Sequence, residues 1–381
     1  MELGIREKPL SKYDLQRNPF PNVGIPYQSD SIYTDRVEEL CIIGNAIKGT
    51  MRGSSAHVVI VGSYGNGKTA TLKFVKEQIE QQIGQALAVY ISNPGETFLE
   101  FYRNFMYEIG VDRLEKFAWS YLELICKKPR LKEKVNKGET LLPEVIENGK
   151  THLHDNLRYT DFATAFLKFV LDETKFLSWK YLCGEPILFE QRKDLDVVSL
   201  IDTDEKALRA LMSLKTLLNL IGYKMICILV DEVESIELLH AFRKQRILNS
   251  IRRLIDLNSS GLCLIMACAP EAWNSIIRDY HAFSERIFRE VILRPLNNEI
   301  IRQFIAGYLK RLRIAEKESH SPIHPFTEDA VKQILVAAQG NLRRVLMICN
   351  RAVDQGAENG FPLLTARKLR EMLPEIFENN V

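Results

Sequence analysis

The sequence lacks any apolar run long enough to span a bilayer. Its start, MELGIREK, has neither the basic residues nor the apolar centre of a signal peptide. Low-complexity tracts and repeats at a fixed period are also missing. The composition, 46% hydrophobic and 26% charged over 381 residues, is typical of a soluble globular protein with one large or two ordinary domains. We therefore expect a cytoplasmic protein that makes no membrane contact.

The sequence also has little net charge and no pattern of paired cysteines. Its 7 cysteines are odd in number, scattered and mostly placed inside apolar runs, which favours reduced core thiols over disulfides or a zinc site. The formal net charge of +2 neither requires nor excludes nucleic acid, because a bound polyanion needs a local basic surface and not a basic total. Composition alone therefore identifies no partner.

A glycine-rich loop, GSYGNGKT, follows an apolar run at 57–61 and precedes a helical pattern, as in a P-loop (Walker A motif). Its glycines let the backbone N–H groups approach a polyphosphate closely. We expect Lys68 to reach the β and γ phosphates and the Thr69 hydroxyl to hold Mg²⁺. The residues predicted to bind a nucleoside triphosphate are Gly62, Ser63, Tyr64, Gly65, Asn66, Gly67, Lys68, Thr69 and Ala70.

An acidic pair, Asp231 and Glu232, follows the apolar run at 225–230. In α/β proteins the carboxyl ends of parallel strands are where ligands bind. We expect Asp231 to bind Mg²⁺, through water, and Glu232 to polarise the water that attacks the nucleotide. Together with the phosphate loop, this pair predicts hydrolysis and not binding alone.

Further apolar runs at 86–92, 262–267 and 290–293 alternate with helical patterns, which predicts a three-layer α/β core with a parallel sheet. Helical spacing at 98–109, 114–126, 162–179 and 207–220 predicts a large helical insertion at about 97–220. Beyond Pro295 the patterns are all helical, at 299–312, 327–338, 342–355 and 365–377. We expect a core at 1–296 with an N-terminal arm, and a helical lid domain at 297–381.

Three features of the sequence allow two interpretations each. Phe20, Ile25 and Tyr33 of the arm either wall an adenine site or simply pack the arm. The basic run at 127–134 either grips phosphates or is a solvated loop. Hydrolysis needs positive charge at the transition state, and Arg286, Arg289 and the pair at 252–253 are either its source or ordinary surface residues.

A fourth feature, Gly340-Asn341-Leu342-Arg343, places a guanidinium at the start of a helix that could fold over the γ phosphate. With this segment, the phosphate loop, the acidic pair and the arginine segment in order, the chain resembles the AAA+ ATPases over about 30–355. Within them it is similar to the origin-recognition and transposition-regulator clade. The segments 176–185, 222–223, 246–256 and 269–271 also resemble the ATP-binding proteins of BREX phage-defence systems.

The resemblance implies a five-stranded parallel sheet of order 5-1-4-3-2, ATP bound between protomers of a ring or filament, and DNA as a frequent partner. By position, Arg343 matches the lid arginine called sensor 2, and Arg286 or Arg289 the arginine supplied by a neighbouring subunit. One departure is at Cys268, where the family usually has a polar sensor 1 residue. Either Asn274 takes that role or hydrolysis is slow.

The leading hypothesis from the sequence is therefore a Mg²⁺-dependent AAA+ ATPase. It would form homo-oligomers with ATP and act on DNA as a switch or motor, in phage defence or in mobile-element and replication transactions. A competing hypothesis is a signalling or scaffold ATPase that acts on a protein partner without DNA. A third is a monomeric nucleotide-binding protein without turnover.

Overall fold

The computed structural model describes residues 10–21, 36–157, 159–287, 289–295, 297–314 and 321–377. Contacts within the chain divide it into two compact units. One unit comprises Met1–Leu40, Gly62–Phe74 and Ile292–Val381, and the other comprises Cys41–Val61 and Val75–Val291. Helices α1 (Val37–Met51) and α2 (Lys68–Gln82) each begin in the first unit and end in the second.

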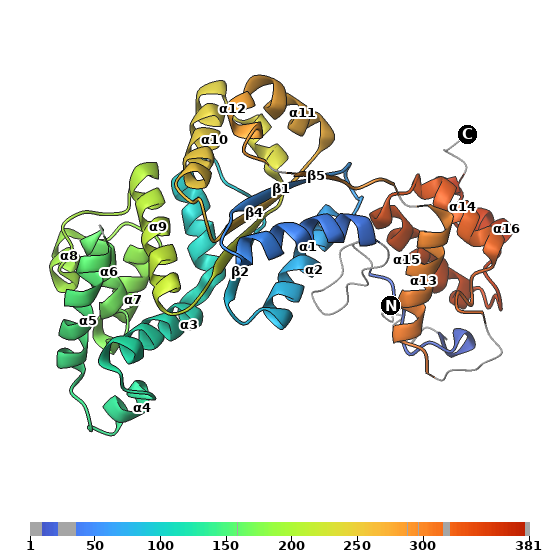
Figure 1. The fold of residues 1–381 in the computed structure, drawn as a ribbon. Coiled ribbons are helices and arrows are strands. Elements are labelled where there is room, and N and C mark those ends of the chain that lie inside the picture. Colours follow the sequence, from blue (N-terminus) through green and yellow to red (C-terminus); the bar gives the residue numbers. More distant parts are fainter. Residues whose placement is uncertain are drawn as a thin grey trace. The chain divides into compact units, whose positions relative to one another are not determined.

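A five-stranded sheet of order β2-β3-β4-β1-β5 forms the centre of the second unit (Figure 1). The strands are β1 (Ala56–Val61), β2 (Ala86–Ile91), β3 (Met225–Val230), β4 (Leu262–Cys268) and β5 (Arg289–Ile292). β3 pairs in parallel with both β2 and β4, and β4 pairs in parallel with β1. Every residue of β1, β3 and β4 is buried, which explains why these strands read as continuous apolar runs and not as alternating ones. The predicted order 5-1-4-3-2 is confirmed.

The helical insertion between β2 and β3 is confirmed, and Figure 1 shows its helices packed together beside the sheet. Its members are α3 (Phe98–Cys126), α4 (Leu131–Asn136), α5 (Leu142–Asn156), α6 (Thr160–Lys168), α7 (Asp172–Leu182), α8 (Phe189–Leu195) and α9 (Asp204–Leu220). The helix expected over 162–179 is wrong as one element, because the chain turns between α6 and α7. The two helices expected over 98–126 are both present within α3, whose helical backbone is interrupted by a kink at Gly110.

After β3 come η2 (Val233–Leu238) and α10 (Ala241–Asp256), and after β4 come α11 (Pro270–Asp279) and α12 (His281–Ser284). Each of these four helices has buried apolar side chains that belong to the same core as the sheet and the insertion. The second unit therefore has one continuous hydrophobic core.

The first unit contains the lid helices α13 (Asn298–Arg311), α14 (Glu328–Ala338), α15 (Leu342–Glu358), α16 (Ala366–Met372) and α17 (Pro374–Phe377). Thr327 and Asn341 occupy the N-cap positions of α14 and α15, and the Asn341 side chain accepts a hydrogen bond from the Arg344 amide. The single helix expected over 365–377 is wrong, because Pro374 cannot continue α16 and starts α17 instead.

The described part of the N-terminal arm, with η1 (Leu10–Tyr13), packs with the lid helices. Phe20 is buried, stacks on Tyr308 with ring centroids 5.6 Å apart, and meets Phe326 edge-on at 6.1 Å. The packing interpretation therefore holds for Phe20, which is enclosed and cannot wall an adenine. Ile25 and Tyr33 lie outside the described residues, and the boundary at 296–297 stays a prediction.

Among the helices of the described residues, none is both long enough and apolar enough to cross a bilayer.

Candidate functional site

The phosphate loop adopts the backbone that its glycines were expected to allow. Gly65 and Gly67 have φ of +83° and +90°, a region that residues with a side chain rarely enter. The Lys68 ammonium is almost fully buried and donates a hydrogen bond to the Gly62 carbonyl, 2.8 Å away. Asn66 is buried and its side-chain amide donates to the Leu293 carbonyl at 3.1 Å. The loop is thus closed on itself and tied to the segment that follows β5.

Arg36 holds the same two segments together. Its guanidinium is 8% exposed and donates to the carbonyls of Asn66 at 3.3 Å and Arg294 at 3.0 Å. It also forms an ion pair with Glu39 at 3.1 Å. The sequence did not single out Arg36, because an arginine at a helix start carries no signal for a contact with residues 30 and 258 positions away.

The start of α15 lies directly against the phosphate loop. The Leu342 amide donates to the Gly65 carbonyl at 3.0 Å, and the Asn341 side-chain amide donates to the Tyr64 carbonyl at 2.7 Å. A Cβ atom on Gly65 would lie 2.2 Å from the Asn341 side chain, so Gly65 also permits this close approach. The Arg343 guanidinium lies over the Tyr64 ring, 4.7 Å from its centroid. The structure therefore places Arg343 beside the loop, and its role toward a γ phosphate stays a prediction.

In the second unit, the acidic pair lies at the carboxyl end of β3. Asp231 is buried, and its two carboxylate oxygens accept hydrogen bonds from the Glu232 amide and the Tyr90 hydroxyl, each at 3.0 Å. Glu232 has φ of +51°, in the left-handed region, which is costly for a residue with a side chain and is concentrated at functional sites. Its exposed side chain makes no hydrogen bond with the described residues, so its carboxylate can reach a water or a ligand.

Tyr90 is a site residue that the sequence did not reveal. It lies on β2, next to β3, so its ring reaches the end of the neighbouring strand. Burial, and then the charge of Asp231 and the hydrogen bond to it, raise the pKa of the Tyr90 hydroxyl well above its usual range. Tyr90 therefore stays protonated and remains a hydrogen-bond donor to Asp231.

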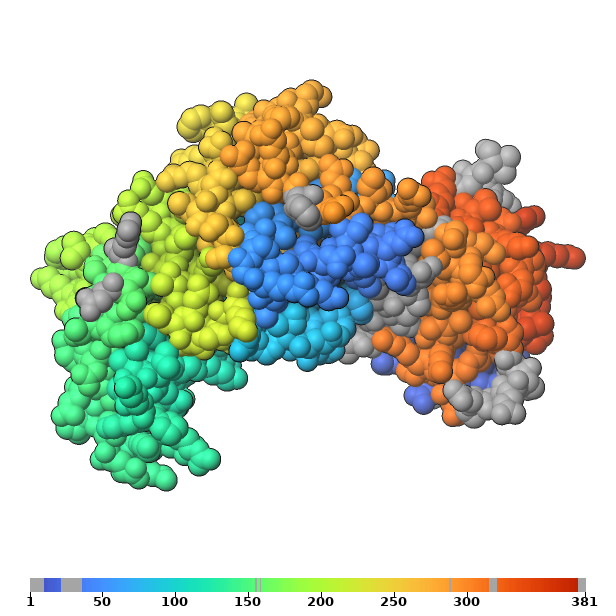
Figure 2. Space-filling view, in the orientation of Figure 1, coloured from blue at the N-terminus to red at the C-terminus, as the bar shows by residue number. Residues whose placement is uncertain are grey.

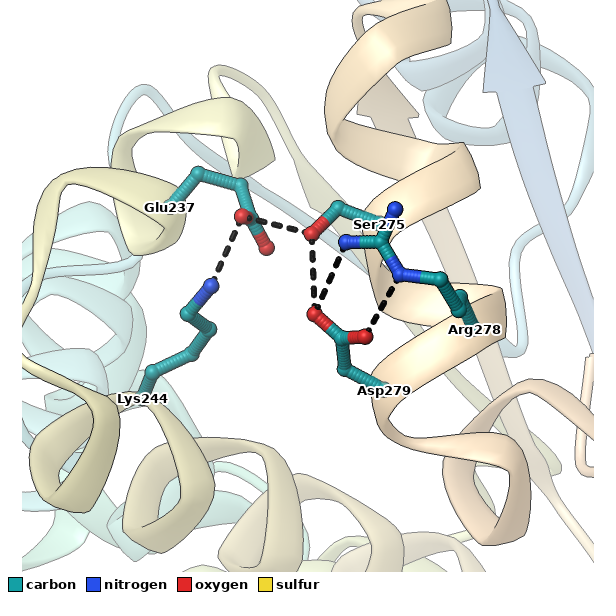
Figure 3. Close-up of polar contacts among 5 residues, drawn as sticks. All are labelled: Glu237, Lys244, Ser275, Arg278 and Asp279. Atoms are coloured by element: carbon teal, nitrogen blue, oxygen red, sulfur yellow. Dashed lines mark hydrogen bonds and ion pairs between the residues drawn. The ribbon is translucent and has the colours of Figure 1, made fainter.

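The segment after the acidic pair is fixed to α10 and to the segments that follow β4. The Glu234 carboxylate accepts the Ala269 amide at 3.2 Å. Figure 3 shows the second connection, in which Glu237 pairs with Lys244 at 2.7 Å and accepts the Ser275 hydroxyl at 2.9 Å. Ser275 also contacts Asp279, which pairs with Arg278. These contacts hold η2 in place, and with it the backbone at Glu232.

The position expected for a polar sensor 1 residue is occupied by Cys268, which ends β4 and is fully buried. Asn274, the alternative, is exposed on α11. Its role stays a prediction.

The candidate arginines lie in different environments. Arg286, 32% exposed, pairs with Asp256 at 3.0 Å and donates to the Ala282 carbonyl at 2.8 Å. Arg289 is exposed on β5. Of the pair at 252–253, Arg253 lines an open pocket of about 530 Å³ near the start of α9.

The predicted ligands fit a magnesium ion by their chemistry. In the part of the chain that the structure describes, no group of three or more His, Cys, Asp or Glu side chains could hold a metal ion. Mg²⁺ does not need such a group, since it keeps several waters and binds one or two protein oxygens together with substrate phosphates. The Thr69 hydroxyl and the buried Asp231 carboxylate are oxygen donors of this kind.

Comparison with known proteins gives two sequence matches. A family model for the BREX system ATP-binding protein BrxC/D matches residues 162–309. An uncharacterized HTH-type transcriptional regulator of Methanocaldococcus jannaschii is 19% identical over 366 residues, which cover 96% of this chain and 73% of the regulator.

Solved structures share the fold at low identity. The ORC2 protein of Aeropyrum pernix, in ADPNP-ADP complexes, has a TM-score of 0.54 at 13% identity and covers 94% of this chain and 71% of its own. The ORC1 protein of A. pernix in complex with DNA has a TM-score of 0.50 at 13% identity. The match covers 93% of this chain and 68% of the ORC1 chain. Cdc6p of Pyrobaculum aerophilum has a TM-score of 0.50 at 14% identity. The match covers 93% of this chain and 70% of the Cdc6p chain. The resemblance predicted from the sequence is confirmed.

The Tyr90 hydrogen bond predicts a stability effect. Tyr90→Phe removes a donor from a buried carboxylate, so the free energy of unfolding should fall by about 1.5–3 kcal/mol in urea denaturation. Tyr107→Phe is the matched control, because Tyr107 donates to Glu185 at 2.9 Å but is 46% exposed. The free energy of unfolding should fall less in the control. Equal decreases in the two variants would show that the hydrogen bond from Tyr90 to Asp231 is no stronger than the exposed one.

Proposed function

We propose that this chain, which has the α/β fold of the P-loop AAA+ ATPases, is a Mg²⁺-dependent ATPase that assembles with ATP and acts on DNA. The observation that carries the proposal is the phosphate loop itself, with Gly65 and Gly67 in glycine conformations and the lid segment at Arg343 against it. Backbone N–H groups of such a loop bind polyphosphate, and a lid cation next to them favours the extra charge of ATP over ADP.

The acidic pair supplies the second half of the proposed chemistry. β1 and β3 are parallel strands on either side of β4, so their carboxyl ends lie at one edge of the sheet. Thr69 and Asp231, which follow these strands in the chain, would hold Mg²⁺, and Lys68 would bind the β and γ phosphates. When bound, Mg²⁺ neutralises phosphate charge and polarises phosphoryl oxygens. Glu232 would orient the attacking water and accept its proton.

Glu232→Gln tests the hydrolysis step. The change removes the general base and keeps the shape of the side chain, so turnover of ATP should fall at least about 100-fold while binding of ATP is retained. Phosphate release and equilibrium binding of ATP measure the two effects. Glu271→Gln makes the same change at an exposed carboxylate on α11 and should leave turnover unaltered. Unchanged turnover in Glu232→Gln would remove Glu232 from this role.

Arg286 and Arg289 are proposed to complete the site of a neighbouring copy in a ring or filament. Their support is position, since Arg286 lies between α12 and β5 and Arg289 is the first residue of β5, and both side chains are at least partly exposed. Stabilising a transition state from another subunit is a known use of arginine, because its charge is permanent.

Subunit mixing tests this sharing. A Lys68→Ala subunit has a defective loop, and an Arg286→Ala or Arg289→Ala subunit has a defective arginine. If sites are shared, mixing the two should restore part of the ATPase activity that each variant lacks alone. Mixtures no more active than the sum of their components would show that each site is self-contained.

DNA is proposed as the partner from a basic segment of the helical insertion. The insertion tip, residues 127–137, joins α3 to α5 and includes α4, which lies at the end of the insertion distant from the sheet (Figure 1). Figure 2 shows this segment at the outer edge of the insertion. The cations of the tip that form no ion pair with the described residues are Lys127, Lys128, Arg130, Lys134 and Lys137. A sixth, Lys132, pairs with Glu115 at 2.7 Å.

The exposure of the tip supports contacts to a phosphate backbone. Lys127 and Arg130 both have left-handed backbone, so the chain changes direction twice within the tip, and four of its five unpaired cations are exposed. Leu131 is fully buried and anchors α4 to the insertion. Exposed positive charge on an anchored segment suits contacts to phosphates, which release counterions.

The salt dependence of DNA affinity tests the tip. Replacing its five unpaired cations by Ala should make the slope of log affinity against log salt less steep by about 0.9 for each duplex phosphate that the variant no longer binds. The matched control replaces five scattered exposed cations, Lys48, Arg52, Lys116, Lys224 and Lys332, and removes the same charge. Equal slopes in the two variants would exclude the tip. Absence of any salt-sensitive affinity in the ATP-bound wild type would favour the protein-partner alternative.

The proposal also includes the biological process in which the chain acts. The match to BrxC/D over 162–309 supports a role in phage defence, and the ORC and Cdc6 likenesses support a role in replication or mobile-element transactions. A cytoplasmic location, expected from the sequence, suits either. A further protein of a multi-component system is a second proposed partner.

A further inference from the structure

We infer that Tyr64 is a positioning residue for Arg343, and that its ring sets how strongly the site prefers ATP to ADP. The inference rests on the proposed function, because it needs a nucleotide in the loop. It goes beyond it by giving a role to a side chain that a phosphate loop does not require: the position between Ser63 and Gly65 contributes its backbone to phosphate binding, whatever its side chain.

Hydrogen bonds of the residues just before Arg343 fix the backbone at this position to the loop, independently of the Arg343 side chain. The Leu342 amide and the Asn341 side chain donate to Gly65 and Tyr64, at 3.0 and 2.7 Å. Asn341 also caps α15 through the Arg344 amide at 3.1 Å. These three hydrogen bonds place the first turn of α15 beside the loop and leave the side chain of Arg343 as the part that can still vary.

The Tyr64 ring then fixes that side chain. It is 70% exposed, and the Arg343 guanidinium lies over it at 4.7 Å, within the range of a cation–π contact. Arg343 forms no hydrogen bond or ion pair with the described residues, so this contact is its main restraint. A long, otherwise free arginine loses several rotamers when it binds a phosphate, and a platform that removes some of them beforehand increases affinity.

The contact between Tyr64 and Arg343 should affect ATP more than ADP because it lies at the phosphate loop. Arg343 is held at the loop that binds the β and γ phosphates, and a cation there interacts more strongly with ATP, which carries the additional phosphate. An ordinary packing role for Tyr64 would affect both nucleotides equally. The ratio of ADP to ATP dissociation constants therefore separates a positioning role from a structural one.

The test measures that ratio with a non-hydrolysable ATP analogue and ADP on the full chain. Tyr64→Leu should lower the preference for the ATP analogue about two- to five-fold, the range expected for one exposed cation–π contact. Tyr64→Phe keeps the ring face and should retain the ratio, and Tyr64→Trp, with a face that binds cations better, should match or raise it. In an Arg343→Ala background, Tyr64→Leu should cause no further change.

Phe361→Leu provides a matched control within the lid. The Lys368 ammonium lies over the Phe361 ring at 4.5 Å, so this variant also removes one aromatic partner of a cation, away from the loop. It should leave the ratio unaltered. If Tyr64→Leu does not fold, Tyr64→Met, which also lacks an aromatic face, replaces it in the comparison with and without Arg343.

Three results would overturn the inference. They are an unchanged ratio in Tyr64→Leu, an equal weakening of both nucleotides, and the same shift whether or not Arg343 is present. If the wild-type chain binds ATP, any of these results in the variants refutes only the role of Tyr64. A wild-type chain that does not bind ATP refutes the proposed function as well.

Discussion

The hydrogen bond from the Leu342 amide to the Gly65 carbonyl is the interaction on which the candidate nucleotide site most depends. The first amides of a helix have no partner within it, and one of them here is satisfied by the phosphate loop. The loop in turn needs glycine at 65, both for its positive φ and because any Cβ there would collide with Asn341. Loop and lid helix therefore constrain each other, and the glycine at 65 permits both the turn of the loop and the close approach of Asn341.

A comparable constraint operates at the acidic pair in the other unit. Asp231 directly follows a fully buried strand and is itself buried, so an unpaired carboxylate there would be costly. The structure satisfies its oxygens with the Tyr90 hydroxyl and the Glu232 amide, and the latter bond accompanies left-handed backbone at Glu232. The contacts of Glu234 and Glu237 in the following 3₁₀ helix stabilise that backbone. The exposed side chain of Glu232 thus projects from a backbone that these contacts hold in place.

The helical insertion is built on a different principle. Its interior is crowded with aromatic rings, such as Phe98 stacked on Phe101 and Phe162 on Phe166. This core is continuous with that of the sheet, so the insertion is a firm extension of the ATPase fold. The tip of the insertion, with its cluster of cations, is therefore attached to the strand that precedes the acidic pair through one continuous core.

The sequence by itself determined the phosphate loop, the acidic pair, the parallel sheet, the insertion and the helical lid. Each depends on local chemistry, namely glycine spacing, carboxylates after an apolar strand, or the period of apolar residues. It also placed Arg343 near the loop, through the resemblance. It failed where helices broke at 169–171 and before Pro374, since apolar periodicity continues through such short turns.

The tertiary structure alone decided what meets across long separations in the chain. Arg36 binds Asn66 and Arg294, Tyr90 binds Asp231, and Phe20 fills the lid core. None of these residues has a neighbour in sequence that reveals its partner. Their contacts arise because strand order and helix packing bring distant positions within hydrogen-bonding or van der Waals distance. A sequence pattern indicates which side chains need partners, and only the packed fold selects those partners.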